Sequence, residues 1–245
     1  MKRLLIASTL FLLSSVGHVL ACDGIAVERT NPSTGNVERV CPVWDGHDYE
    51  IFWYEKVDDT WSSGTQLTDD AADDVAPHLA FDGSGGTGVV WRKSGSNGRV
   101  WYRGRKLVSG EHAWQSAVVA VSDADHDASA PWITFHGSTP RVAWHEYASG
   151  SDTRVVTAEG DGGDPWPTAF SSDLLATTSY DEDLMLEIRS KNGALWVVWV
   201  NSDSYLGYSE WNSDDQSWSA ASYEAYDGPG DIGAGKQRIE DRVTR

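Results

Sequence analysis

A tryptophan that recurs with a nearly constant spacing is the feature that most constrains the fold of this chain. One series follows polar turns at intervals of 53, 52 and 52 residues and comprises Trp61, Trp114, Trp166 and Trp218. A second series ends β-branched runs at intervals of 53 and 55 residues and comprises Trp91, Trp144 and Trp199. Both series share one period, which indicates that the chain is built from repeated structural units.

Each unit contains four short apolar runs separated by clusters of Gly, Ser, Asp and Asn. Four strands in a unit of this length are typical of a propeller blade. The sequence therefore predicts an all-β propeller with four-stranded blades and a period of about 52 residues. Four blades are visible, and a fifth blade or a truncated ring stays open as an alternative. The outermost strands are expected at Trp61–Leu67, Trp114–Val121, Trp166–Ser171 and Trp218–Tyr223.

The expected domain organisation has three parts. Residues 1–21 read as a signal peptide, with two basic residues, an apolar run too short to span a bilayer and small residues before Cys22. Residues 22–230 form the propeller, and residues 231–245 form a tail or the start of a further blade. The protein is therefore expected to be exported, as a secreted or periplasmic protein.

The chain contains only two cysteines, Cys22 and Cys41, and they have two mutually exclusive interpretations. In an oxidising compartment such a pair forms one disulfide. Alternatively, the segment Val-Leu-Ala-Cys resembles a bacterial lipobox, and lipidation of Cys22 would make the chain an outer-surface lipoprotein.

The charge of the chain limits its partners. A formal net charge of -18 repels nucleic acid and anionic membranes. Thirteen tryptophans carry too much apolar surface for a disordered chain. A glycan or a protein remains as the expected ligand.

The turn sequence GDGGDPW supplies Asp161, Gly163 and Trp166, with Glu159 at the position of a hydroxyl residue. In this turn and in its period, over about residues 37–223, the chain resembles sialidase-like bacterial propellers that carry Asp-box (neuraminidase) repeats. A sialidase resemblance implies three arginines that clamp a carboxylate, a Tyr–Glu nucleophile pair and an acidic Asp. Only Arg92 lies at the end of a second strand beside the axis, and the Arg-Ile-Pro signature is missing. The resemblance therefore implies the fold more than the activity.

The loops after each second strand and those before each innermost strand share one side of a propeller, here called the upper face. A varied polar set after the second strands predicts a ligand site there, and it comprises Asp45, Arg92, His145, Glu146 and Asn201. Ordinary solvated loop residues are the alternative. The loops before the innermost strands contribute Asp69, Asp73, Asp123 and Asp127. Clustered carboxylates of this kind suit calcium, although aspartate also favours turns.

The tryptophans divide into packing residues and candidates for stacking on sugar rings. Residues that recur at equivalent positions are expected to pack between blades, and they are Trp44 with the two periodic series. The candidates for stacking are Trp53, Trp101, Trp132, Trp196 and Trp211. The sequence thus favours an exported, non-catalytic propeller that binds a glycan or protein through its upper face. A sialidase-like glycoside hydrolase and a lipid-anchored envelope scaffold are the alternatives.

Overall fold

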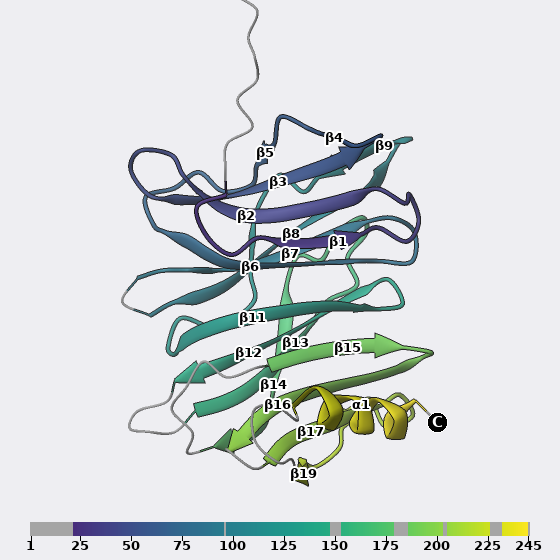
Figure 1. The fold of residues 1–245 in the computed structure, drawn as a ribbon. Helices are drawn as coiled ribbons and strands as arrows, with labels where there is room; N and C mark the ends of the chain where they lie inside the picture. The colour runs from purple at the N-terminus through teal and green to yellow at the C-terminus, as the bar shows by residue number, and fades with distance from the viewer. Residues whose placement is uncertain are drawn as a thin grey trace, which may run out of the picture.

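The computed structural model describes residues 22–95, 97–147, 153–178, 186–202, 205–225 and 232–244. Four antiparallel sheets follow one another along the chain and stack face to face (Figure 1). Each sheet corresponds to one unit of the tryptophan period, so the predicted all-β class and the repeated four-stranded blades are confirmed. The predicted signal peptide, residues 1–21, lies outside the described residues.

Within each sheet the chain runs as a meander from the innermost strand outward. The first sheet contains β1 (Val27–Thr30), β2 (Val37–Trp44), β3 (Tyr49–Val57), β4 (Thr60–Trp61) and β5 (Thr65–Gln66). The second contains β6 (Asp74–Phe81), β7 (Thr87–Lys93), β8 (Arg99–Val108), β9 (Glu111–Trp114) and β10 (Val119–Ala120). The third contains β11 (Asp127–His136), β12 (Thr139–Tyr147), β13 (Thr153–Gly160) and β14 (Phe170–Thr178). The fourth contains β15 (Leu186–Lys191), β16 (Ala194–Ser202), β17 (Tyr205–Asn212), β18 (Ser217–Trp218) and β19 (Ser222–Ala225).

The outermost strand differs from the prediction in three of the sheets. It is split into two short pieces, which are β4 and β5 in the first sheet, β9 and β10 in the second, and β18 and β19 in the fourth. In each of these sheets both pieces pair with the same neighbouring strand. The periodic tryptophan lies in the first piece, where Trp61 pairs with Lys56 and Trp114 with Arg105. The polar turn therefore forms a short hairpin of its own before the outermost strand continues.

In the third sheet the periodic Trp166 lies in the turn before β14, and not in a strand as expected. The carboxylate of Asp161 organises this turn, because Asp161 Oδ1 accepts the backbone N–H groups of Gly163 at 3.1 Å and Thr168 at 3.0 Å. These hydrogen bonds also lower the pKa of Asp161, the first cause being the hydroxyl of Thr168. The turn contains the residues on which the Asp-box resemblance rests.

Consecutive residues of each second strand point to opposite neighbours. In β7, Val89 packs against the first sheet and Val90 against the third. In β16, Val197 packs against the third sheet, whereas Val198 packs under a C-terminal helix. A strand that is buried on both faces needs apolar residues at every position, which explains the continuous runs GVVW and WVVW.

The tryptophan assignments are partly confirmed. Trp91, Trp144 and Trp199 are fully buried, as expected for packing between sheets. Trp44 is different, because it is the last residue of β2 and is 47% exposed. Trp53 is a core residue, which argues against the predicted stacking on a ligand, and Trp196 is also buried but lines the cavity described below.

Both ends of the stack are covered by other parts of the chain. Helix α1 (Ile232–Val243) lies against β16, β17 and β19 of the fourth sheet (Figure 1). Its Ile239 is fully buried against Trp196, Val198 and Leu206. A helix thus lies within residues 231–245, for which the sequence predicts a tail or the start of a further blade. Within the described residues, no helix has the length and apolar character needed to cross a bilayer.

The outer face of the first sheet is covered by the segment that begins at Cys22. Cys22 forms a disulfide with Cys41 of β2, with a Cα–Cα distance of 5.7 Å. Asp23 N–H donates to Pro42 O at 3.1 Å, so the segment runs beside β2. The disulfide alternative is therefore the one that the structure shows, and it supports export to an oxidising compartment.

Candidate functional site

The upper face brings some of the predicted ligand residues together and separates others. Arg92 Nη2 lies 2.9 Å from Asp127 Oδ1, and Arg92 Nε donates to Ala128 O at 2.8 Å. Gly98 N–H also donates to Asp127 Oδ1, at 2.7 Å. A predicted ligand residue and a predicted calcium residue thus pair with each other and tie β7 to the start of β11.

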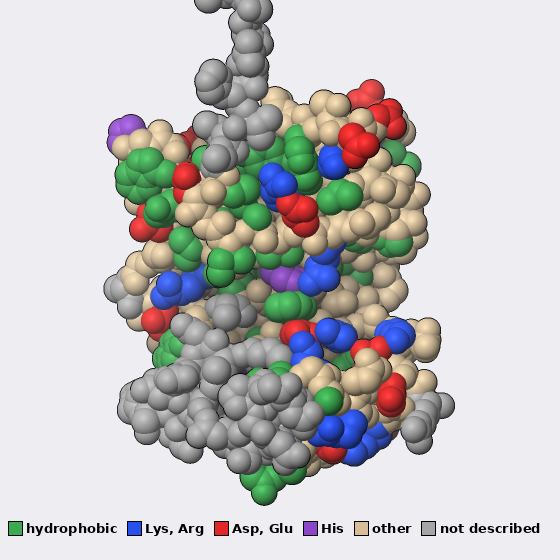
Figure 2. Space-filling view, viewed as in Figure 1, with side chains coloured by type: hydrophobic (Ala, Val, Ile, Leu, Met, Phe, Trp, Pro, Cys, Tyr) green, Lys and Arg blue, Asp and Glu red, His purple; other side chains and the backbone are tan. Residues whose placement is uncertain are grey.

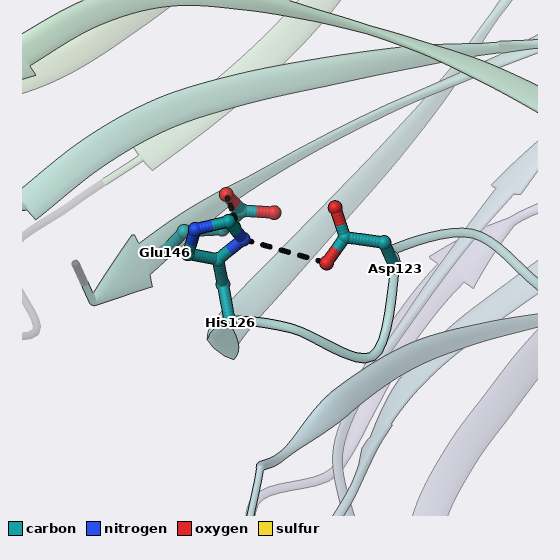
Figure 3. A group of neighbouring side chains, drawn as sticks. All are labelled: Asp123, His126 and Glu146. Atoms are coloured by element: carbon teal, nitrogen blue, oxygen red, sulfur yellow. Dashed lines mark hydrogen bonds and ion pairs between the residues drawn. The ribbon is translucent and has the colours of Figure 1, made fainter.

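A second group on this face contains Asp123, His126 and Glu146 (Figure 3). His126 Nδ1 lies 3.4 Å from Asp123 Oδ1 and 3.8 Å from Glu146 Oε2. Arg154 Nη1 lies 2.9 Å from His126 Nε2, which must accept because a guanidinium can only donate. The proton of a neutral His126 is therefore on Nδ1, between the two carboxylates. In this state the Nδ1–H of His126 faces the two carboxylates. Nδ1 therefore has no free lone pair with which to coordinate a metal ion that these carboxylates also bind.

Glu146 thus belongs to this second group, whereas His145, Asn201 and Asp45 are dispersed. His145 and Glu146 are buried, and Glu146 Oε1 accepts the indole N–H of Trp144 at 3.0 Å. Asn201 lies half-buried on β16. Asp45 lies in the exposed turn after β2, where its Oδ1 accepts the N–H of His47 at 2.8 Å. This hydrogen bond is the main cause that lowers the pKa of Asp45.

The four aspartates predicted to bind calcium do not form one site. Asp73 Oδ1 accepts the N–H of Tyr49 at 3.1 Å. Asp69 lines a groove of about 520 Å³ together with Asp70, Lys93 and Arg103. Asp123 and Asp127 belong to the two separate groups described above. Asp73 and Asp127 thus bind groups on β3 and β7, and a calcium ion shared by equivalent loops stays a prediction.

A carboxylate cluster that spacing alone does not reveal lies beside Asp45. Ligand oxygens of Asp45, Asp48 and Glu50 lie within 4.8 Å of one another. Glu50 accepts the hydroxyl of Thr68 and, through Oε1, the N–H of Asp70 at 3.1 Å. Burial raises the pKa of Asp48, and the neighbouring charge of Asp45 raises it further. Burial likewise raises the pKa of Glu50.

A cavity of about 470 Å³ lies where the innermost strands of all four sheets converge. Its wall combines apolar and cationic side chains from β1, β6, β11 and β15 with one residue of α1, and it includes Arg29, Phe81, Trp132, Ile188, Arg189, Lys191 and Glu240. Most of these residues lie toward the turns between the first and second strands, on the side away from the upper face. We call this space the axial cavity. In Figure 2, basic side chains and a histidine lie across the middle of one face of the molecule.

Arg29 is the distinctive cation of the axial cavity. Its Nη2 lies 2.9 Å from His78 Nε2, and its guanidinium lies 5.7 Å from the ring centroid of Trp132. Among the described residues it forms no ion pair with a carboxylate. Burial lowers the pKa of Arg29 and holds the pKa of His78 well below its ordinary value. His78 is therefore neutral. The charge that opposes Arg29 is Glu187, which raises the pKa of Arg29 through space without forming an ion pair with it.

The other charges near the axial cavity are paired. Arg189 lies 2.7 Å from Glu187 and 3.0 Å from Glu240 of α1. Lys191 also pairs with Glu240, and Lys236 pairs with Glu187. The hydrogen bond from Lys191 is the main cause that lowers the pKa of Glu240. Both glutamates are thus neutralised by cations within the protein.

The sequence singled out Trp132 and Trp196 for stacking but not the axial cavity that they line, because the approach of Arg29 and Arg189 to them depends on how the sheets converge. The aligned segments PHLAF and PWITF place His78 and Trp132 at equivalent positions. Alternate residues of a strand share one face, so Ala80 and Thr134 point the same way as these two. Polar and aromatic residues at such alternate positions are the signal that could have located the cavity.

Comparisons with known proteins give structural likenesses only. No family model and no curated protein matches the chain. An exo-1,5-alpha-L-arabinanase from a bovine ruminal metagenomic library matches with 14% identity and a TM-score of 0.44, over 80% of this chain and 76% of that chain. Trypanosoma rangeli sialidase matches with 12% identity and a TM-score of 0.45, over 80% and 37%. The Aleuria aurantia lectin matches with 14% identity and a TM-score of 0.47, over 82% and 62%.

The chain therefore spans little more than a third of the length of that sialidase. At these identities and TM-scores the likenesses carry no argument about ligand or activity. The assignment of the fold follows from the four sheets themselves.

Proposed function

We propose that this protein is a carbohydrate-binding propeller that holds an anionic saccharide in the axial cavity without cleaving it. The observation that carries the proposal is Arg29, which forms no ion pair with a carboxylate of the described residues and lies beside the ring of Trp132. Sugars present both apolar ring faces and hydroxyl groups, and acidic sugars add a carboxylate. A guanidinium is the side chain best suited to bind such a carboxylate with two hydrogen bonds.

The charge distribution supports an anionic ligand. The whole chain has a formal net charge of -18, yet three of the residues that line the axial cavity are Arg29, Arg189 and Lys191. Solubility does not require cations at this place. The local positive potential attracts an anion to the axial cavity, whereas the acidic surface of the rest of the protein repels it.

The paired glutamates favour binding over hydrolysis. A glycosidase needs one carboxyl group that stays protonated near neutral pH, and therefore a raised pKa. Glu240 has a lowered pKa, because Lys191 and Arg189 stabilise its ionised form. Glu187 is bound by Arg189 and Lys236. Neither residue is arranged as a general acid.

A glycan array followed by calorimetric titration tests the proposal. The chain from residue 22 should bind acidic saccharides and ignore their neutral counterparts. Arg29→Gln should weaken binding by about 10–100-fold, since a hydrogen bond to a charged group contributes about 1.5–3 kcal/mol. Arg39→Gln is the matched control, because Arg39 lies on the outer face of the first sheet, where it pairs with Glu28.

Three results would contradict this proposal. Equal affinity of Arg29→Gln and wild type would remove Arg29 from the site. Preference for neutral saccharides would remove the electrostatic argument. Turnover of a fluorogenic glycoside panel by the same sample would replace binding with hydrolysis.

The upper face is the second candidate surface for the same function. The observation that favours it is the convergence of Asp123, His126 and Glu146 from a loop and a strand (Figure 3). Substituting Asp123 and His126 by alanine in one variant tests it without disturbing the buried His145 and Glu146. Loss of glycan binding in this variant, with Arg29→Gln unaffected, would move the ligand to the upper face.

A further inference from the structure

Helix α1 brings a carboxylate to the wall of the axial cavity. Glu240 of α1 is only 9% exposed, and it lines the cavity together with residues of the innermost strands. Its two oxygens contact two cations of β15, because Oε2 lies 3.0 Å from Arg189 Nη1 while Oε1 pairs with Lys191 Nζ. The protein thus holds one of its own acidic groups between the cations of the fourth sheet.

The contacts of Glu240 are those that a ligand carboxylate would make at the same place. A carboxylate binds best when each of its oxygens accepts a hydrogen bond from a cation. Arg189 and Lys191 supply these two donors, and they lower the pKa of Glu240, the hydrogen bond from Lys191 being the main cause. Glu240 is therefore ionised at neutral pH and competes with an external carboxylate for the same donors.

The three cations of the axial cavity consequently differ in what they offer a ligand. Arg189 is shared between Glu187 at 2.7 Å and Glu240 at 3.0 Å. Lys191 is paired with Glu240. Arg29 forms no ion pair with a carboxylate of the described residues. A first acidic group can bind Arg29 without displacing a protein carboxylate, whereas a second acidic group reaches Arg189 or Lys191 only by displacing one.

We propose that Glu240 limits the axial cavity to saccharides with a single acidic group, because it occupies Arg189 and Lys191. This inference rests on the proposed function, since it concerns the ligand that Arg29 binds. Displacing Glu240 breaks two ion pairs and leaves a mostly buried carboxylate without its donors. A second acidic group on the ligand forms new pairs of the same kind, so it gains little affinity in exchange.

The packing of α1 keeps Glu240 in this position. The preceding residue, Ile239, is fully buried in a cluster that includes Trp196 of the fourth sheet. One turn earlier in the helix, Lys236 pairs with Glu187 of β15. The helix therefore cannot withdraw Glu240 from the cavity without losing apolar contacts and a second ion pair.

Calorimetric titration with digalacturonate and with its monomethyl ester tests this inference. The two probes have the same sugar rings and differ by one carboxylate. The wild type should bind both with similar affinity, within about threefold, because only Arg29 is available to an acidic group. Glu240→Gln keeps the size of the side chain and frees Lys191 and part of Arg189. This variant should bind digalacturonate about 5–20-fold more tightly than the monomethyl ester.

Glu224→Gln is the matched control. Glu224 of β19 pairs with Arg238 and Arg242 of α1 but does not line the axial cavity. Its substitution also removes one negative charge and weakens the attachment of the helix, so it should keep the wild-type ratio of the two affinities. Adding Lys191→Gln to Glu240→Gln should remove most of the gained preference for digalacturonate.

The outcomes separate this inference from the proposed function. If the wild type binds both probes and Glu240→Gln leaves the ratio of their affinities unchanged, only the role of Glu240 is overturned. The wild type tests the inference without any variant, because a preference of tenfold or more for digalacturonate would show that Glu240 excludes no second acidic group. If neither the wild type nor Glu240→Gln binds either probe, the proposed function fails together with the inference.

Discussion

At the scale of single residues, the buried carboxyl of Asp74 shows how the sheet contacts control protonation. Asp74 lies at the start of β6, where Trp91 of β7 donates to it. Burial raises its pKa to about 7, and the charge of Asp70 adds to this effect. An unfolded chain would ionise the same group near its ordinary value of 3.8. The folded state therefore holds a proton that the unfolded state releases.

This difference predicts a pH dependence of stability that Asp74→Asn should remove. Because the folded pKa is raised, the contribution is fully present below about pH 4 and is lost as the pH rises to about 7. The total loss is on the order of 4 kcal/mol. Urea unfolding of wild type and Asp74→Asn across this range, in chelator, measures it. Parallel curves for the two proteins would show that Asp74 ionises normally in the folded state.

Residue positions on the upper face were predictable, but their partners were not. The sequence places Arg92 and Asp127 on the same face because both flank predicted strands. Their mutual ion pair depends on how β7 and β11 approach each other in the third dimension. Asp48 was missed because it lies four residues after Trp44, beyond the one or two positions that the repeat aligns after each second strand.

At the scale of elements, the second strands were the most predictable, because burial on both faces leaves a continuous apolar run, as in β7 and β16. The innermost strand of the first sheet was less predictable, because most of its residues are exposed. The split outermost strands were not predictable, because short exposed pieces such as β5 and β10 carry little apolar pattern. Helix α1 was also missed. Its buried face repeats as Ile232, Ile239 and Val243, which is a helical spacing, but two glycines weaken the signal.

The segment tied by the disulfide permits a direct test at this scale. Cys22→Ser/Cys41→Ser should lower the free energy of unfolding by about 3 kcal/mol, because the bridge closes a loop with a sequence separation of 19. For a chain of this size, Tm should fall by about 6–12 °C. Wild type treated with a thiol reductant is the control and should show the same loss. An unchanged Tm in both samples would mean that the segment stays on β2 without the bridge.

At the scale of the whole molecule, the stack of four sheets has two ends that are protected differently. The first sheet is covered by the chain that leads into β1, and the fourth by α1. Ion pairs hold the helix in place, including those of Glu240 with Arg189 and of Arg242 with Glu224. Terminal repeats in stacked proteins need such covers, because their outer faces otherwise expose apolar surface.

Removal of α1 should therefore promote self-association. A chain that ends at residue 225 would expose the face of Trp196, Val198 and Tyr208. Light scattering coupled to size exclusion should show a molar mass that rises with concentration, relative to the full chain. If the truncated chain does not fold, Ile239→Ala supplies the test, with an expected loss of about 2–5 kcal/mol in unfolding free energy. A folded truncated chain that behaves like the full chain would show that α1 is dispensable as a cover.

The cover on the fourth sheet also determines how the axial cavity can respond to a ligand. Among the described residues, the first and fourth sheets both line the axial cavity, and the strand contacts between sheets run from the first to the second, from the second to the third and from the third to the fourth. A ligand bound to Arg29 would therefore contact side chains of the first, second, third and fourth sheets at once, and its binding should protect all four sheets together against unfolding.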